Sequence, residues 1–179
     1  MYTQEDIIKA YGPFVEGDAN DPVYIQQCID EISIFPSVLR AFADKLSDEQ
    51  LNACYRDGSW TFRQVIHHIA DSHMNAFGRF KLALTEDNPV IKPYIQNAWA
   101  DSVDSVMADP RLSVSLIEAL HARWVILLKS LTVDELKKTY QHPEYQKVFP
   151  LSYAMGLYAW HGKHHYTQMY RYASNQGWI

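Results

Sequence analysis

The sequence has little of several features that would assign it at once to a class. It holds two cysteines, Cys28 and Cys54, which stand far apart and outside any CxxC spacing. Neither a disulfide framework nor a thiolate metal site is therefore expected. No apolar run approaches the roughly 20 residues that span a bilayer, and the first residues, MYTQEDIIKAYGPF, lack the basic and apolar regions of a signal peptide. We expect a cytoplasmic protein in a reducing compartment, with no membrane contact.

Positive charge is also scarce. The chain carries 16 Lys and Arg against 21 Asp and Glu, with a net charge of -5, and its basic residues form no stripe. A nucleic-acid partner is therefore not expected. The 179 residues, of which 47% are apolar, are enough for one globular domain spanning 1–179 with a sizeable core.

Apolar residues recur at helical spacing in four long segments. These are Pro22–Leu46, Trp60–Leu84, Ser113–Leu131 and Ser152–Asn175. Asp21 is a natural N-cap before Pro22, whereas Pro36 should kink or break the first helix. Thr61 begins a capping-box pattern for the second helix, with Ser59 as a rival cap.

Shorter elements are expected between the long helices. Capping-box patterns begin at Ser47 and Thr132 and predict short helical turns. No segment alternates clearly like a strand, and YQKVF is the best weak candidate. The long segment between Leu84 and Ser113 has three prolines but also apolar side chains, so we expect an ordered crossover. The pattern predicts an all-α four-helix bundle with this crossover between its second and third helices.

Histidines are concentrated in AWHGKHHYTQM, which places three of the chain's eight within five residues. His161 and His165 are four apart and share one face of a helix. Their face continues through Ala154, Tyr158 and Gln168 and should point into the bundle. His164 is rotated about 100° from His165 and is the less favoured ligand.

A third histidine is expected from the second helix, in TFRQVIHHIADSH. His68 shares an apolar face with Val65, Ile69 and Ser72, whereas His67 aligns with more polar residues. One interpretation is a buried histidine satisfied by a hydroxyl or a carbonyl group. The other is that His68, His161 and His165 bind one divalent cation, with zinc or nickel favoured by three imidazole ligands. Three protein ligands leave a coordination position open, as in catalytic zinc sites.

The chain resembles the YfiT-like branch of the DinB superfamily, whose members are described as metal-dependent hydrolases and include bacillithiol S-transferases. The segments that carry the resemblance are YRDGSWTFRQVIHHIADSHMNAFGRFKLALTEDNPVIKPY, LHARWVILLKSL and LYAWHGKHH. The resemblance runs from about Asp48 to the C-terminus.

The resemblance implies an antiparallel four-helix bundle with a long crossover, a divalent metal held by three histidines, and a homodimer. Its metal motifs fall on His68, His161 and His165, with His67 as the rival for the first position. It also implies hydrolysis or the transfer of a low-molecular-weight thiol, with a small molecule as substrate. Gly162, inside the second motif, could allow close approach of a neighbouring helix or of substrate.

Other polar residues are candidates for catalysis. Asp71, one turn from His68, could orient that ring or act as a base, or could form a surface ion pair with Arg63. Arg63 and Arg79 could receive an anionic group of the substrate, and Asn75 could contact bound solvent. Gln168 could do the same, and Tyr94 and Trp99 of the crossover could line the pocket mouth. We treat His73, His121 and His142 as structural or surface residues.

Two functions therefore compete. The first is a metal-dependent hydrolase or thiol S-transferase that uses an open three-histidine site. The second is a non-catalytic metal-binding bundle with a stress-related binding role. A fourth protein ligand that closes the site would favour the second function, because structural metal sites leave no position open.

Overall fold

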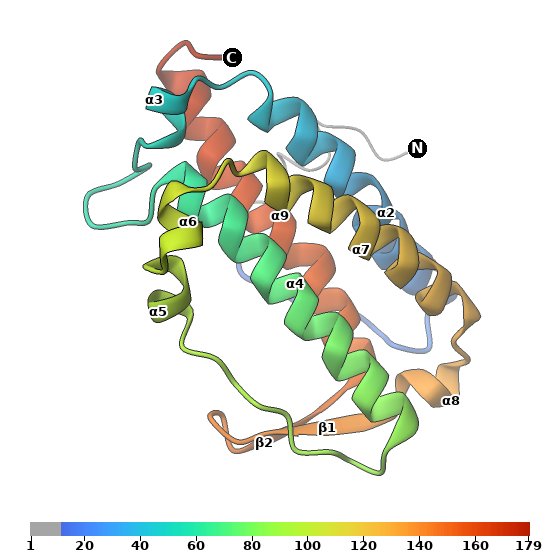
Figure 1. Ribbon diagram of the computed structural model, residues 1–179. Coiled ribbons are helices and arrows are strands. Elements are labelled where there is room, and N and C mark those ends of the chain that lie inside the picture. The colour runs from blue at the N-terminus through green and yellow to red at the C-terminus, as the bar shows by residue number, and fades with distance from the viewer. Residues whose placement is uncertain (1–11) are drawn as a thin grey trace.

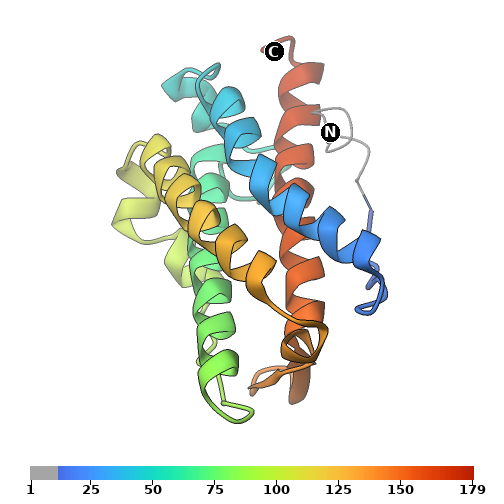
Figure 2. The same cartoon turned by 90° about the vertical axis from the view of Figure 1, so that its right-hand side faces the viewer.

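The computed structural model describes residues 12–179, and its four long helices form a bundle. The helices are α2 (Pro22–Ala43), α4 (Phe62–Thr85), α7 (Arg111–Ser130) and α9 (Leu151–Asn175). Helix α2 packs against α7 and α9, and α4 packs against the same two helices. Figure 2 shows α2 and α7 in front of α4 and α9. The predicted four-helix bundle is confirmed.

The crossover determines the direction of the helices. In Figure 1, α4 and α7 run from upper left to lower right, and α2 and α9 run the other way. Side-chain contacts agree, since Arg40 near the end of α2 bonds Glu118 near the start of α7. Likewise, Arg79 in the second half of α4 bonds Tyr158 in the first half of α9. The antiparallel neighbours are therefore α2 with α7 and α4 with α9.

Capping side chains start several helices where the sequence predicts them. Capping boxes begin at Thr61, Ser47 and Thr132, and they start α4, α3 (Asp48–Leu51) and α8 (Val133–Leu136). Each box satisfies backbone N–H groups that the helix itself leaves unpaired, and such a cap contributes about 1 kcal/mol. The two short helices turn the chain at the ends of the bundle (Figure 1).

Helix α2 begins at its predicted cap, where Asp21 accepts a hydrogen bond from the backbone of Val23 at 2.8 Å. It then runs through Pro36 without interruption and ends at Ala43. The expected break at Pro36 is therefore wrong, whereas a kink there stays a prediction. A proline leaves the carbonyl four residues earlier without its helical donor, and here another helix supplies a donor to Ile32, as described below.

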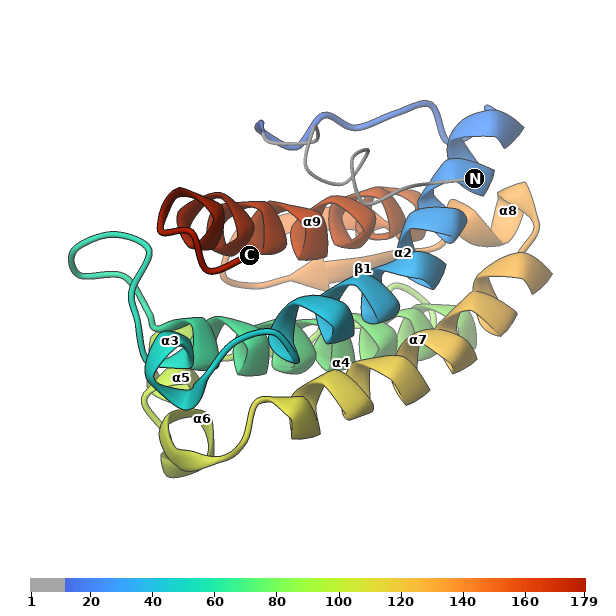
Figure 3. The same cartoon turned by 90° about the horizontal axis from the view of Figure 1, so that it is seen from above.

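The crossover is ordered, and two short helices lie within it, α5 (Gln96–Ala100) and α6 (Val103–Met107). Both pack against α4. Figure 3 shows them beside the start of α4. The crossover thus covers one side of the helix that carries His68.

A small hairpin closes the other end of the bundle (Figure 1). Its strands are β1 (Thr139–His142) and β2 (Lys147–Pro150), paired antiparallel. The crossover is tied to it, because Ile91 N–H donates to Gln141 O at 3.0 Å. The weak strand pattern in YQKVF is confirmed as β2 and the turn before it.

The core consists of two groups of buried apolar side chains, one toward each end of the bundle. Phe42, Phe62 and Tyr166 belong to one group, and Phe80 and Trp124 belong to the other. The histidines of α9 fall between the two groups along the helix. None of the helices in residues 12–179 is long and apolar enough to cross a membrane. The expectation that residues 1–14 form no signal peptide falls largely outside the described residues.

Candidate metal centre

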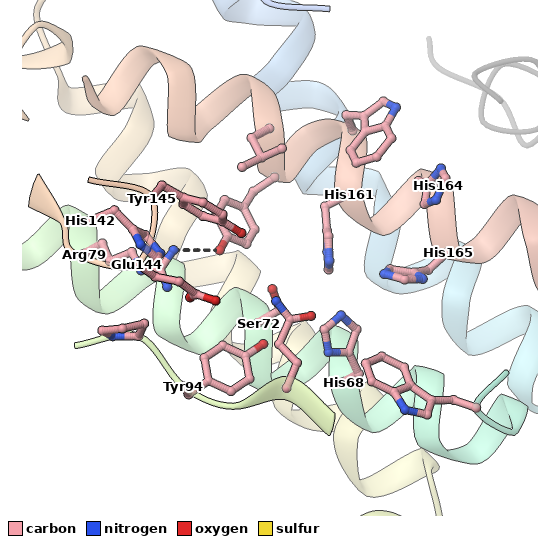
Figure 4. A pocket seen from close by; sticks show the side chains of 16 residues that line it. His68, Ser72, Arg79, Tyr94, His142, Glu144, Tyr145, His161, His164 and His165 are labelled. Carbon is pink, nitrogen blue, oxygen red and sulfur yellow. Dashed lines mark hydrogen bonds between the residues drawn. The ribbon is translucent and has the colours of Figure 1, made fainter. Parts of the chain in front are cut away.

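Three histidines from α4 and α9 converge on one point. Figure 4 shows His161 and His165 projecting from α9 toward His68 of α4. The ring centroids of His68 lie 5.3 Å from His161 and 5.0 Å from His165, and the latter two are 4.7 Å apart. One possible ligand atom of each residue lies within 4.8 Å of the others. The residues that share the predicted inward faces do meet, and their binding of a metal stays a prediction.

Burial keeps these three rings neutral. It lowers the pKa of His68 to about 4 and that of His165 to about 3. It also lowers the pKa of His161 well below the ordinary value, and neighbouring histidines add to the effect. Neutral imidazole is the form that binds a metal. Three neutral imidazoles without a thiolate suit a borderline divalent ion such as zinc, so the donor set fits the predicted cofactor.

His67, the rival for the first position, points away from the cluster. Its Nδ1 lies 2.7 Å from Ser113 Oγ, and its Nε2 lies 3.3 Å from Ala108 O. A carbonyl oxygen only accepts, so Nε2 donates to Ala108 and Nδ1 accepts from the Ser113 hydroxyl. One nitrogen of His67 therefore attaches the crossover to α4 and the other attaches the start of α7, whereas His68 faces the cluster.

A cavity of about 360 Å³ opens beside the three histidines. Figure 4 shows His68, His161 and His165 at one end and Arg79, His142, Glu144 and Tyr145 gathered at the other, with Ser72 and Tyr94 between them. The remaining lining residues are Trp60, Pro93, Gln96, Leu157, Tyr158, Trp160 and His164. No fourth histidine, cysteine or carboxylate joins the metal cluster among the described residues. An ion held by these three histidines would therefore have a coordination position free for a reactant from the cavity.

Arg79 places a positive charge at the far end of this cavity. Its Nη1 donates to Tyr158 Oη at 3.3 Å. None of the ion pairs within residues 12–179 involves Arg79, although Glu144 lines the same cavity. The guanidinium therefore lies where an anionic group of a bound molecule could reach it, and the anion contact expected from the sequence stays a prediction.

Asp71 has a pKa raised to about 6, by burial and then by the nearby Asp104 carboxylate. It does not line the cavity, and no hydrogen bond joins it to His68 in the part of the chain that the structure describes. The structure therefore does not place Asp71 where it could orient His68. The catalytic role expected of Asp71 stays a prediction.

Arg63 and Asn75 also lie outside the cavity. The buried Arg63 guanidinium donates to Asn52 Oδ1 at 3.0 Å and to Ala108 O at 2.7 Å, and it also pairs with Asp48. It thereby holds the crossover and α3 against α4. Asn75 Nδ2 donates to the Asp71 carbonyl at 2.8 Å. Arg63 and Asn75 thus make contacts within the fold, and the substrate and solvent contacts expected of them stay predictions.

Of the remaining candidates, Tyr94 lies in the cavity wall, whereas Trp99 and Gln168 do not. Tyr94 lines the cavity, whereas Trp99 packs behind it, with ring centroids 4.6 Å apart. Gln168 Nε2 lies 3.1 Å from His164 Nε2. His164 lines the cavity rim and is stacked on Trp160, outside the metal cluster.

Sequence reasoning missed several residues of the site. His142 was expected to be structural or at the surface, yet it is 5% exposed and lines the cavity from β1. Tyr158 was recognised as inward but not as a partner of Arg79. His73 and His121 are buried in the core, and both belong to a hydrogen-bonded series that reaches His161. In the sequence, the signal for these contacts was Pro36, because a proline inside a helix leaves a carbonyl group that needs another donor.

The chain is similar in sequence and architecture to known proteins. The DinB superfamily profile matches residues 32–169. A Bacillus subtilis protein named "Putative metal-dependent hydrolase YfiT" is 43% identical over 152 residues, which cover 85% of this chain and 84% of the relative. An Oceanobacillus iheyensis relative with a similar name is 46% identical over 156 residues, covering 87% of this chain and 90% of its own.

The solved structure of YfiT from Bacillus subtilis superimposes on this chain with a TM-score of 0.91 at 39% identity. The match covers 94% of this chain and 96% of the solved one. That protein is described as a probable metal-dependent hydrolase with an unusual four-helix bundle topology. The helix directions described above are therefore shared with a relative of similar sequence.

Proposed function

Because the chain belongs to the DinB superfamily, we propose that it is a metal-dependent enzyme that holds a divalent ion at His68, His161 and His165. The observation that carries the proposal is the convergence of three neutral imidazoles at the wall of an open cavity. The names of the relatives, as metal-dependent hydrolases, support the same activity.

The chemistry follows from the donor set. A zinc ion held by three imidazoles would keep a coordination position open and would lower the pKa of its bound water to about 7. Around that position, the side chains of the cavity bind and orient the substrate. Arg79 and the Tyr158 hydroxyl would receive an anionic or polar group at the far end, and Tyr94 forms part of the wall between. Hydrolysis of a small ester or amide with such a group is the reaction that this arrangement favours.

Transfer of a low-molecular-weight thiol is the second activity open to the same site. A metal ion held there would favour the thiolate form of such a thiol, whose proton would pass to solvent. The thiolate sulfur would then replace a leaving group, such as chloride, on an electrophilic carbon. The sulfur would come from a cosubstrate, because burial raises the pKa of Cys28 to about 11 and neither Cys28 nor Cys54 lines the cavity. The homodimer that the family resemblance implies and the cytoplasmic location that the sequence suggests stay predictions.

A turnover screen tests the enzyme proposal and separates its two reactions. Purified protein loaded with zinc or nickel would be mixed with chromogenic esters and amides and, separately, with several thiols plus monochlorobimane. Turnover should disappear in His161→Ala and persist in His67→Ala, whose ring serves the crossover instead. Turnover that survives replacement of all three cluster histidines would contradict the proposal, as would its absence with every substrate class in protein that binds metal.

A further inference from the structure

The carbonyl group of Ile32 is left without a helical donor. In an α-helix this oxygen accepts from the N–H of the residue four positions later, and that residue is Pro36, which has no N–H. His121 of α7 supplies the missing donor, because its Nδ1 lies 2.7 Å from Ile32 O. The proline in α2 thus creates a buried acceptor that a histidine of another helix satisfies.

The contact continues through two more histidines. The other ring nitrogen of His121, Nε2, lies 2.8 Å from His73 Nδ1 on α4. The far nitrogen of His73, Nε2, lies 3.2 Å from His161 Nδ1 on α9. We call His121, His73 and His161 the histidine series. Together with Ile32, it joins all four long helices by hydrogen bonds.

The direction of every bond in the series follows from its first acceptor. A carbonyl oxygen cannot donate, so His121 Nδ1 carries the proton and, in the neutral ring, His121 Nε2 accepts. His73 must then donate from Nδ1 and accept at Nε2. His161 in turn donates from Nδ1, which leaves the lone pair on its Nε2. The reverse direction would place two lone pairs face to face 2.7 Å apart at Ile32.

We propose that His121 and His73 are positioning residues that fix the tautomer of His161, so that its Nε2 lone pair is the atom offered to the ion. A histidine ligand commonly donates its other N–H to a carboxylate or carbonyl group, and this sets its tautomer and orientation. In this protein the acceptor is a second histidine, His73. Its tautomer is set through His121 by the Ile32 carbonyl group, which Pro36 leaves without a helical donor. The inference rests on the metal site of the proposed function.

A purely structural role is the alternative. Phe35 stacks near both rings, with its centroid 6.1 Å from that of His73 and 6.1 Å from that of His121. If the two histidines served only to fill the core between α2, α4 and α7, an aromatic ring without nitrogens would replace them equally well. The hydrogen-bond series predicts the opposite for metal binding, since a phenyl ring neither donates nor accepts.

The first test needs no metal and no variant of the series. In metal-free protein with ¹⁵N-labelled histidine, long-range ¹H–¹⁵N spectra at neutral pH show which ring nitrogen carries the proton. His121, His73 and His161 should all be protonated on Nδ1. His67 is an internal control for the opposite tautomer, because its contact with Ala108 O requires the proton on Nε2. His161 protonated on Nε2 would overturn the inference.

The second test compares His121→Gln with His121→Phe. Gln retains one donor and one acceptor, whereas Phe retains the ring shape and loses both. Zinc affinity, measured by chelator competition, should fall about 10–100-fold in the Phe variant and recover in large part in the Gln variant. Equal affinities in wild type and the Phe variant would refute the positioning role. If the Phe variant does not fold, the wild-type spectra still decide the matter.

The two proposals fail in different ways. Reversed tautomers in a protein that still binds zinc through its histidine cluster would overturn the positioning role alone. The expected tautomers in a protein that binds no divalent ion would overturn the proposed function and leave the direction of the series established. The labelled metal-free sample and the zinc titration therefore report on separate claims.

Discussion

Phe35 of α2 lies so close to Gly162 of α9 that a Cβ atom at position 162 would be 2.8 Å from Phe35 Cζ. Phe35 is buried, and its ring also covers His73 and His121. The glycine directly after His161 thus allows α2 to approach the helix that carries two of the three cluster histidines. The sequence left open whether Gly162 serves a neighbouring helix or a substrate, and the structure assigns it to the helix.

Replacing Gly162 by Ala should therefore destabilise the protein. Alanine gains about 1 kcal/mol over glycine in a helix interior, but overpacking in a core typically costs about 1–3 kcal/mol. Phe35 is 2% exposed and its ring contacts those of His73 and His121, so its displacement would disturb the core. The free energy of unfolding from urea titration should therefore fall. Gly78→Ala is the matched control, because no atom lies within 4 Å of a Cβ there, and it should raise stability. An equal rise in the free energy of unfolding in both variants would contradict this prediction, because it would show that α2 moves aside at little cost.

The fold was largely predictable because its signals are local. Capping boxes at Ser47, Thr61 and Thr132 and the spacing of apolar residues define the helices without reference to distant parts of the chain. The same periodicity predicted that His68 faces inward on α4. Helix directions were less accessible, because they depend on how the crossover returns the chain between α4 and α7.

The surroundings of the site could not be predicted in the same way. His142 reaches the cavity because the β1–β2 hairpin folds back under the bundle, and nothing in its own segment signals this. Arg63 looked as available as Arg79, yet only the tertiary fold shows that Asn52 and the Ala108 carbonyl take its donors. Whether a polar side chain faces a cavity or a structural acceptor depends on partners far away in sequence.

The stability of the metal-free protein should fall as the pH falls below 6.5. Burial lowers the pKa of His68 and of His121 from 6.5 to about 4, so the unfolded chain binds more protons than the folded one between these values. Unfolding free energy therefore decreases with falling pH, by up to about 1.4 kcal/mol per pH unit for each such histidine. Urea titrations in the presence of a chelator, at about pH 7 and about pH 5, measure this slope.

A variant identifies the source of this pH dependence. His68→Phe should show a shallower slope, because one buried titrating group is removed from the folded state. A free energy of unfolding that stays constant, or that rises as the pH falls, would mean that these rings become protonated in the folded protein as readily as in the unfolded chain.

Arg79→Gln should weaken the binding of anionic substrates. A hydrogen bond to a charged group contributes about 1.5–3 kcal/mol, so KM should rise on the order of 10–100-fold, with a smaller change in kcat. Arg123→Gln is the control, since that side chain lies outside the cavity and over the Phe77 ring. Neutral analogues of the same substrate should lose little with either variant. An equal loss for neutral and anionic substrates would argue against an anion contact at Arg79.

The metal content of the purified protein tests the central claim most directly. Elemental analysis after dialysis against zinc or nickel should give one ion per chain in the wild type and in His67→Ala, and none in His68→Ala or His161→Ala. The adjacent pair His67 and His68 makes the comparison strict, because only the second ring faces the cluster. Wild-type protein without a stoichiometric ion, or a His68→Ala variant that retains it, would contradict the account.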